Sequence, residues 1–112
     1  MDDSILNTIK KMIGIDKDYD AFDMDLIVHI NSIISTIAQI GGCQSGKYIT
    51  NEKDTWTDIF GDYSNISELK SYMYIKIRLI FDPPGNSFIT ESMNKMASEF
   101  EWRIAMEKEA KN

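Results

Sequence analysis

Apolar residues recur at intervals of three and four along most of the chain, the spacing by which a helix presents one buried face. This pattern predicts four main helices and a shorter third one, over residues 3–13, 22–40, 55–60, 66–81 and 87–110. Residues 42–54 are polar and predict a loop, with a short extended piece at residues 48–50. The expected fold is therefore all-α, a small helical bundle.

Glycine and proline mark the ends of these segments. Glycines follow the first three predicted helices, where the chain must leave the helical conformation: Gly14, Gly41, Gly42 and Gly61. Asn65 and Glu68 have the spacing of a capping box, which predicts the start of the fourth helix. Pro83 and Pro84 end that helix, because proline lacks an amide donor and restricts the residue before it. A Pro-Pro turn therefore precedes the long C-terminal helix.

The fourth segment is apolar over most of its circumference. Its two stripes are Ile66–Leu69–Met73–Ile77–Ile80 and Tyr72–Ile75–Leu79. Such a helix is normally central, so we expect it inside the bundle or between copies of the protein. The fifth segment has one expected buried face, formed by Ile89, Met93, Met96, Phe100 and Ile104.

Length and composition set the class of protein. The chain has 112 residues, of which 43% are hydrophobic and 27% charged, and we expect residues 1–112 to form one globular domain. The longest apolar runs are too short to span a bilayer, so no membrane partner is expected. A single cysteine, Cys43, allows no internal disulfide and fits a reducing compartment such as a cytoplasm.

The charge balance argues against nucleic-acid recognition. Twelve basic and eighteen acidic residues give a formal net charge of −6, and Arg78 and Arg103 are the only arginines. Proteins that bind DNA or RNA neutralise phosphates with clustered Lys and Arg. Tight binding of nucleic acid by this chain alone is therefore disfavoured.

Two motifs resemble ligand sites but are incomplete. Residues 41–47 have the G-x4-G-K spacing of a phosphate loop, but Tyr48 stands where Ser or Thr must bind magnesium, and a helix precedes the loop where a strand is required. Asp16, Asp18 and Asp20 alternate like calcium ligands, but the glycine and the bidentate glutamate that such a loop needs are missing. We therefore expect a flexible connection and a solvated acidic turn, with no cofactor and no metal.

Catalytic signals are equally weak. His29 and Cys43 are single residues without a recognisable third group, and the common hydrolase and metalloprotease motifs do not occur. We interpret the chain as a non-enzyme. Trp102 and Arg103 lie together beside the main stripe of the last helix, and such residues are typical anchors of protein interfaces. Trp56 is a further candidate.

Several segments resemble the head–tail connector, or adaptor, proteins of tailed bacteriophages and prophages. The most specific is Tyr72-Met73-Tyr74-Ile75-Lys76-Ile77-Arg78-Leu79-Ile80-Phe81-Asp82-Pro83-Pro84, an aromatic and basic helix that runs into Phe-Asp-Pro-Pro. Residues 33–42 and 56–61, the pair Ser87-Phe88 and the last helix with Glu99, Glu101 and Arg103 are similar too. The likeness covers nearly the whole chain.

The resemblance implies a structural protein of the virion neck without an active site. Family members form a ring, commonly dodecameric, that docks on the portal, extends the DNA channel and receives the next neck or tail-completion protein. Such a protein is assembled in the bacterial host cytoplasm. The C-terminal segment of family members engages the portal, which makes residues 102–111 candidates for that contact. The candidate interface residues for the ring and its partners are Trp56, Tyr72, Arg78, Asp82, Pro83, Pro84, Phe88, Trp102, Arg103 and Met106.

The acidity of the chain suits a conduit for DNA. Carboxylates facing the lumen would repel phosphates, so that the duplex passes without specific binding, and the stretch Asp16–Asp25 is the candidate lining. Arg78 and Asp82, four residues apart, are expected to pair near the end of the fourth helix. The alternative function is a small acidic regulatory or inhibitory helical protein that binds another protein.

Overall fold

The computed structural model describes residues 3–63 and 65–111, with side chains up to Glu107. These residues form five helices, α1 (Ile5–Met12), α2 (Asp23–Gln39), α3 (Trp56–Phe60), α4 (Ile66–Phe81) and α5 (Ser87–Lys111). The described residues contain no strand, only an isolated antiparallel bridge between Ser4 and Thr55. The predicted all-α fold, with a short third helix and a long last one, is confirmed.

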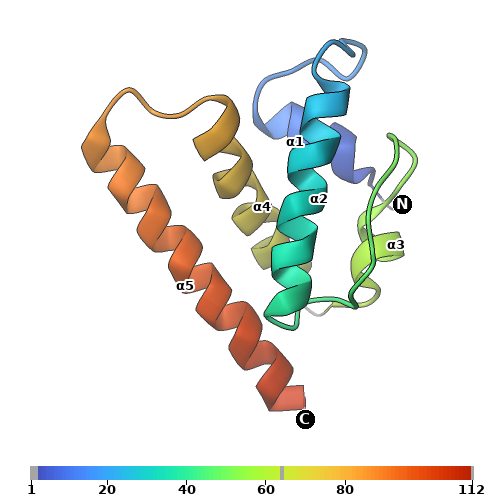
Figure 1. The fold of residues 1–112 in the computed structure, drawn as a ribbon, viewed down its shortest axis with the longest axis vertical. Helices are drawn as coiled ribbons and strands as arrows, with labels where there is room; N and C mark the ends of the chain where they lie inside the picture. Colours follow the sequence, from blue (N-terminus) through green and yellow to red (C-terminus); the bar gives the residue numbers. More distant parts are fainter. Residues whose placement is uncertain (1–2, 64, 112) are drawn as a thin grey trace.

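Helix α4 is the centre of the arrangement. It packs against α1, α2 and α5, and α1 also packs against α2. In Figure 1, α5 forms one side of the molecule and α3 lies on the other. The turn at residues 82–86 brings the chain from the end of α4 to the start of α5. The sequence prediction that the fourth segment is central is therefore correct.

The core is built mainly from isoleucine. Ile30, Ile34 and Ile37 on α2 and Leu69, Met73 and Ile77 on α4 are almost completely buried. These positions follow the helical spacing of the sequence, so the apolar stripes of α2 and α4 face each other as the pattern predicts.

Side-chain caps fix two helix starts. Ser4 accepts a hydrogen bond from the Asn7 amide at the start of α1. Thr55 and Asp58 form a reciprocal capping box at the start of α3. The capping box predicted at Asn65 and Glu68 is wrong, because Asn65 makes no side-chain cap and the Glu68 side chain is buried.

The long loop after α2 is tied down at two points. Asn31 on α2 bonds both the amide and the carbonyl of Ile49, with an amide-to-Oδ1 distance of 2.7 Å, and Ile49 is buried. Gly42 is buried where a Cβ atom would collide with Cγ2 of Ile37 and lie 2.9 Å from Cγ2 of Ile104. The C-terminal part of α5 therefore rests against the glycine that follows α2.

Helix α5 is buried less than the sequence predicts. Ile104 and Ala97 are buried, and Met93 and Phe100 are half-buried. Ile89 and Met96 were expected on the buried face, but each is 48% exposed. The reason is geometric, since α5 packs mainly against one neighbouring helix, α4, and the N-terminal half of α5 has little to cover it.

Candidate protein-binding surfaces

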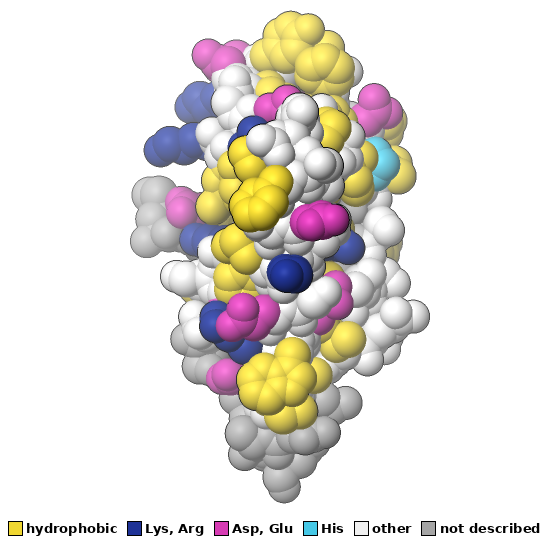
Figure 2. All heavy atoms as spheres, turned by 90° about the vertical axis from the view of Figure 1, so that its left-hand side faces the viewer, with side chains coloured by type: hydrophobic (Ala, Val, Ile, Leu, Met, Phe, Trp, Pro, Cys, Tyr) yellow, Lys and Arg dark blue, Asp and Glu magenta, His cyan; other side chains and the backbone are white. Residues whose placement is uncertain are grey.

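The outer side of α5 carries an apolar ridge, which we define as Phe88, Ile89, Met96 and Trp102. Phe88 is 76% exposed and Trp102 is 63% exposed. Hydrophobic side chains extend along this face of the molecule between charged ones (Figure 2). Large exposed apolar surfaces of this kind mark sites of protein contact.

The C-terminal part of α5 holds three of the predicted site residues. Trp102 is exposed, Arg103 pairs with Glu99 and lies over the ring of Phe100, and Met106 is half-buried. The ion pair and the ring contact hold the Arg103 guanidinium in place on the surface of α5. An exposed Trp and an ordered Arg on one helix are suitable anchors for a protein partner.

Four further candidates surround the turn between α4 and α5. Arg78 donates to the carbonyl of Asp82 at 2.9 Å and lies 3.5 Å from its carboxylate, which confirms the predicted pair. Arg78 also donates to the Tyr74 hydroxyl. Pro83 is exposed and Pro84 is half-buried, and Phe88 follows Pro84 by four residues. These residues stiffen the turn that positions the start of the ridge.

The structure places the remaining two candidates in the interior. Trp56 is 2% exposed and donates through Nε1 to Thr8, and Tyr72 is fully buried and donates to Glu101 at 2.6 Å. Neither side chain offers a surface to a partner in this conformation. Trp56 joins α3 to α1, and Tyr72 joins α4 to α5, so both stabilise the fold.

A groove between α1, α2 and α4 is a surface that the sequence analysis missed. We call it the α1–α2–α4 groove, and its volume is about 530 Å³. Its lining residues are Ile13, Ile15, Phe22, Asp25, His29, Ile80, Phe81 and Asp82. Phe81 makes edge-to-face contacts with Phe22 and His29 across the groove. Three separate segments contribute, so no local spacing in the sequence could reveal it.

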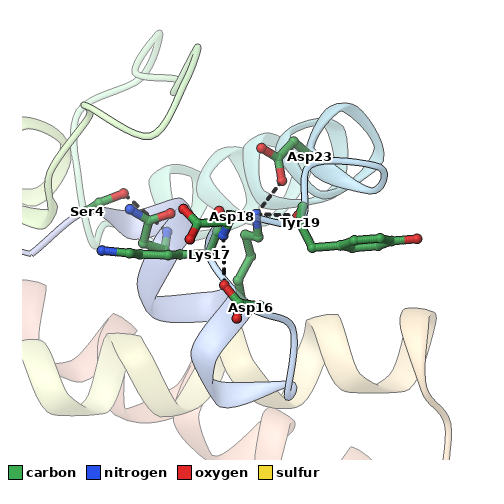
Figure 3. Close-up of polar contacts among 8 residues, drawn as sticks. Ser4, Asp16, Lys17, Asp18, Tyr19 and Asp23 are labelled. Carbon is green, nitrogen blue, oxygen red and sulfur yellow. Dashed lines mark hydrogen bonds and ion pairs between the residues drawn. The ribbon is translucent and has the colours of Figure 1, made fainter.

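The acidic turn after α1 is organised by a buried lysine. Lys10 is fully buried, and its ammonium donates to the carbonyls of Lys17 and Tyr19 and to the carboxylate of Asp23, at 2.7 to 2.9 Å. Figure 3 shows Tyr19 and Asp23 converging on this ammonium, while Asp16 caps the amide of Asp18. Among the described residues, no three acidic, His or Cys side chains gather as metal ligands would. A protein cation occupies the centre of this turn.

The other chemical candidates lie apart. His29 packs against Phe81, whereas Cys43 follows the far end of α2 and contacts the carbonyl of Ile34. Burial raises the pKa of the Cys43 thiol, so it is a poor nucleophile. The glycine-rich loop at residues 41–47 leads from α2 into irregular backbone, where Lys47 contacts the carbonyl of Asp58.

Acidic groups gather where the C-terminal part of α5 meets α4. Burial raises the pKa of the Glu68 carboxyl; Arg103 opposes this shift and Glu107 adds to it. Burial and the charges of Glu68 and Glu107 also raise the pKa of Tyr63 to about 12. Burial, together with the hydrogen bond to Glu101, raises the pKa of Tyr72. The contact between α4 and α5 therefore favours the protonated, neutral forms of these acidic groups.

The fold and these surfaces define a small helical protein equipped for contacts with other proteins. The family model described as phage connector protein matches residues 5–111, nearly the whole chain. The chain therefore belongs to the phage connector protein family, and the resemblance noted from the sequence is confirmed. No curated protein and no solved structure matches it.

Membership of this family supports a connector role at the phage neck, as a virion component that contacts other head or tail proteins. Within the described residues, no helix has the length and apolar character needed to cross a membrane.

Proposed function

We propose that the protein is a structural, non-enzymatic component of the phage neck that forms a ring, docks on the portal, extends the DNA channel and joins head to tail. The observation that carries the proposal is the family match over residues 5–111. The exposed ridge of α5 supports it, because a chain that functioned alone would be expected to bury Phe88 and Trp102. Residues 1–112 act as one helical unit in this proposal, and twelve copies are expected in the particle.

The portal contact is assigned to the C-terminal part of α5. Trp102 is the anchor, Arg103 supplies a charge held in place by Glu99, and Met106 extends the contact. The next neck or tail-completion protein binds elsewhere on the ring.

The acidic turn is assigned to the channel. Asp16, Asp18 and Asp20 are exposed, whereas Asp23 is held by Lys10 and Asp25 lines the α1–α2–α4 groove. Exposed carboxylates facing the lumen would repel the phosphates of a passing duplex. The proposal for the lumen fails if the assembled particle has these aspartates on its outer wall.

Mass photometry of the protein alone and mixed with the portal of the same phage tests the proposal. Addition of about twelve copies of the 12.9 kDa chain to the portal is the expected result. A protein that stays monomeric or dimeric and ignores the portal would contradict it. That outcome would favour the alternative of a small acidic protein that regulates or inhibits another protein.

A further inference from the structure

The ridge and the groove are two apolar surfaces on the same chain that nothing covers in the described part of the protein. At the N-terminal end of the ridge, Phe88 is 76% exposed and Ile89 is 48% exposed. The groove has the opposite shape, and its volume of about 530 Å³ is sufficient for an aromatic and an aliphatic side chain. One surface projects and the other is hollow.

We propose that Phe88 and Ile89 of one copy insert into the α1–α2–α4 groove of the next copy, where they pack against Phe22, Ile80 and Phe81. This inference rests on the proposed ring function and names the contact by which neighbouring subunits would join. It leaves the C-terminal end of the ridge, at Trp102, available to the portal.

The chain does not fill its own groove. Phe88 and Ile89 remain exposed although they follow Phe81 by only seven and eight residues. The Pro-Pro turn leads the chain away from the end of α4 before α5 begins (Figure 1). Arg78 holds this turn through the carbonyl and carboxylate of Asp82. Within one copy, the turn thus keeps the start of the ridge, at Phe88, away from the groove that Phe81 lines.

Such a pair of surfaces builds assemblies of more than two copies. A contact between two different patches is heterologous, so each copy offers a free ridge on one side and a free groove on the other. Repetition of that contact gives a ring when the rotation between copies closes. A contact between two ridges would instead stop at a dimer.

Charge complementarity favours a second copy as the occupant. Asp25 and Asp82 line the groove, and Asp82 is already paired with Arg78. Lys95 lies on the same side of α5 as Phe88, two turns or about 10.5 Å further along. Neither Asp25 nor Lys95 makes an ion pair with any described residue. The projecting surface therefore brings a cation to a groove that has an unpaired carboxylate.

Photo-cross-linking tests the contact in the full chain. Phe88 is replaced by p-benzoylphenylalanine, which keeps an aromatic ring at the position, and the protein is irradiated alone and on the portal. The expected adduct joins two copies, and its peptide maps to residues 13–29 or 75–82 of the neighbour. The matched control carries the same group at Asn94, an exposed position of α5 outside the ridge, and should not label these peptides.

The same samples separate this inference from the proposed function. If twelve or so copies bind the portal but position 88 cross-links to the portal, or to the ridge of another copy, the groove contact is overturned while the ring function stands. If no copies bind the portal, the proposed function itself fails. An assembled ring without any adduct at the groove also overturns the contact.

A charge exchange provides a second measurement if the aromatic probe prevents assembly. Lys95→Glu should raise the protein concentration for half-maximal assembly by roughly twofold to fivefold, the range of an exposed charge pair. Adding Asp25→Lys to the same chain should restore it, and Asp25→Lys alone should weaken assembly. Circular dichroism first checks that all three variants are folded. If the double variant then assembles as poorly as the sum of the two single losses, Lys95 and Asp25 do not pair.

Discussion

At the scale of single residues, Lys10 has the least expected role. Lysine side chains are almost never fully buried unless they are paired, and the side chain of Lys10 is fully buried. Three acceptors from the acidic turn match the three donors of the ammonium. The lysine thereby fixes where the turn returns to α2.

Lys10→Met should destabilise the protein by about 2–4 kcal/mol, because it leaves two carbonyls and the Asp23 carboxylate without their donor. Urea unfolding followed by circular dichroism measures the change. Lys11→Met is the control, since Lys11 is the exposed neighbour on the same helix and its loss should cost little. Equal unfolding free energies for the two variants would show that the buried ammonium contributes no net stability.

Gly42 is the second residue whose role depends on close packing. Gly42→Ala should cost about 1–3 kcal/mol, because a Cβ atom there meets the buried side chains of Ile37 and Ile104. Thermal unfolding measures the loss. Gly85→Ala is the matched control, since no heavy atom lies within 4 Å of its added Cβ. An unchanged melting temperature for Gly42→Ala would mean that α5 does not rest against the end of α2.

At the scale of elements, the contact between α4 and α5 decides how the long helix is held. Tyr72 and Glu101 join the two helices by a hydrogen bond, and Ile104 and Ala97 supply the buried surface. Glu68 is buried in the same region, and none of the described residues bonds its Oε1. Ionisation of this carboxyl therefore opposes folding.

The sign of the resulting pH dependence follows from the raised pKa of Glu68. The folded protein retains this proton at pH values where the unfolded chain has lost it, so stability falls as pH rises from the unfolded value through the folded one. Glu68→Gln should remove this loss. The free energy of unfolding of the variant should therefore increase relative to that of the natural protein as pH rises from 4 to 7. Urea unfolding across that range measures the difference.

Glu91→Gln is the control for this experiment, because Glu91 is exposed on the outer part of α5. The difference in unfolding free energy between Glu91→Gln and the natural protein should stay nearly constant with pH. If the natural protein instead gains stability relative to Glu68→Gln as pH rises, the expected sign of the pH dependence is wrong.

At the scale of the whole molecule, the uneven covering of α5 links fold to function. The helix is anchored at Gly42 and along α4, but its outer side remains apolar and exposed. A partner that covers this side gains the free energy of burying Trp102 and Phe88 without refolding the bundle.

Trp102→Ala should therefore weaken portal binding by about thirtyfold, the loss of an interface anchor worth ~2 kcal/mol. Titration of the portal, followed by mass photometry, measures the affinity. Tyr48→Ala is the control, because Tyr48 is equally exposed but lies in the loop after α2. If both variants bind the portal like the natural protein, the assignment of the portal contact to α5 is wrong.

The sequence by itself determined the helices, because the long ones carry periodic apolar stripes and the first four are followed by glycine or proline. It also indicated the connector family through the segment that ends in Phe-Asp-Pro-Pro, and the match over residues 5–111 agrees. The pair of Arg78 with Asp82 was predictable because both residues lie one turn apart on one helix.

Only the tertiary structure decided which apolar residues stay exposed and which polar ones are buried. Ile89 and Met96 match the helical period as well as Ile104 does, but the N-terminal half of α5 lies apart from α4 (Figure 1), whereas Ile104 lies against Gly42. Trp56 and Tyr72 were candidate interface residues and are core residues, and the charged Lys10 is buried as well. Burial depends on which elements meet in space, and the period within one helix does not contain that information.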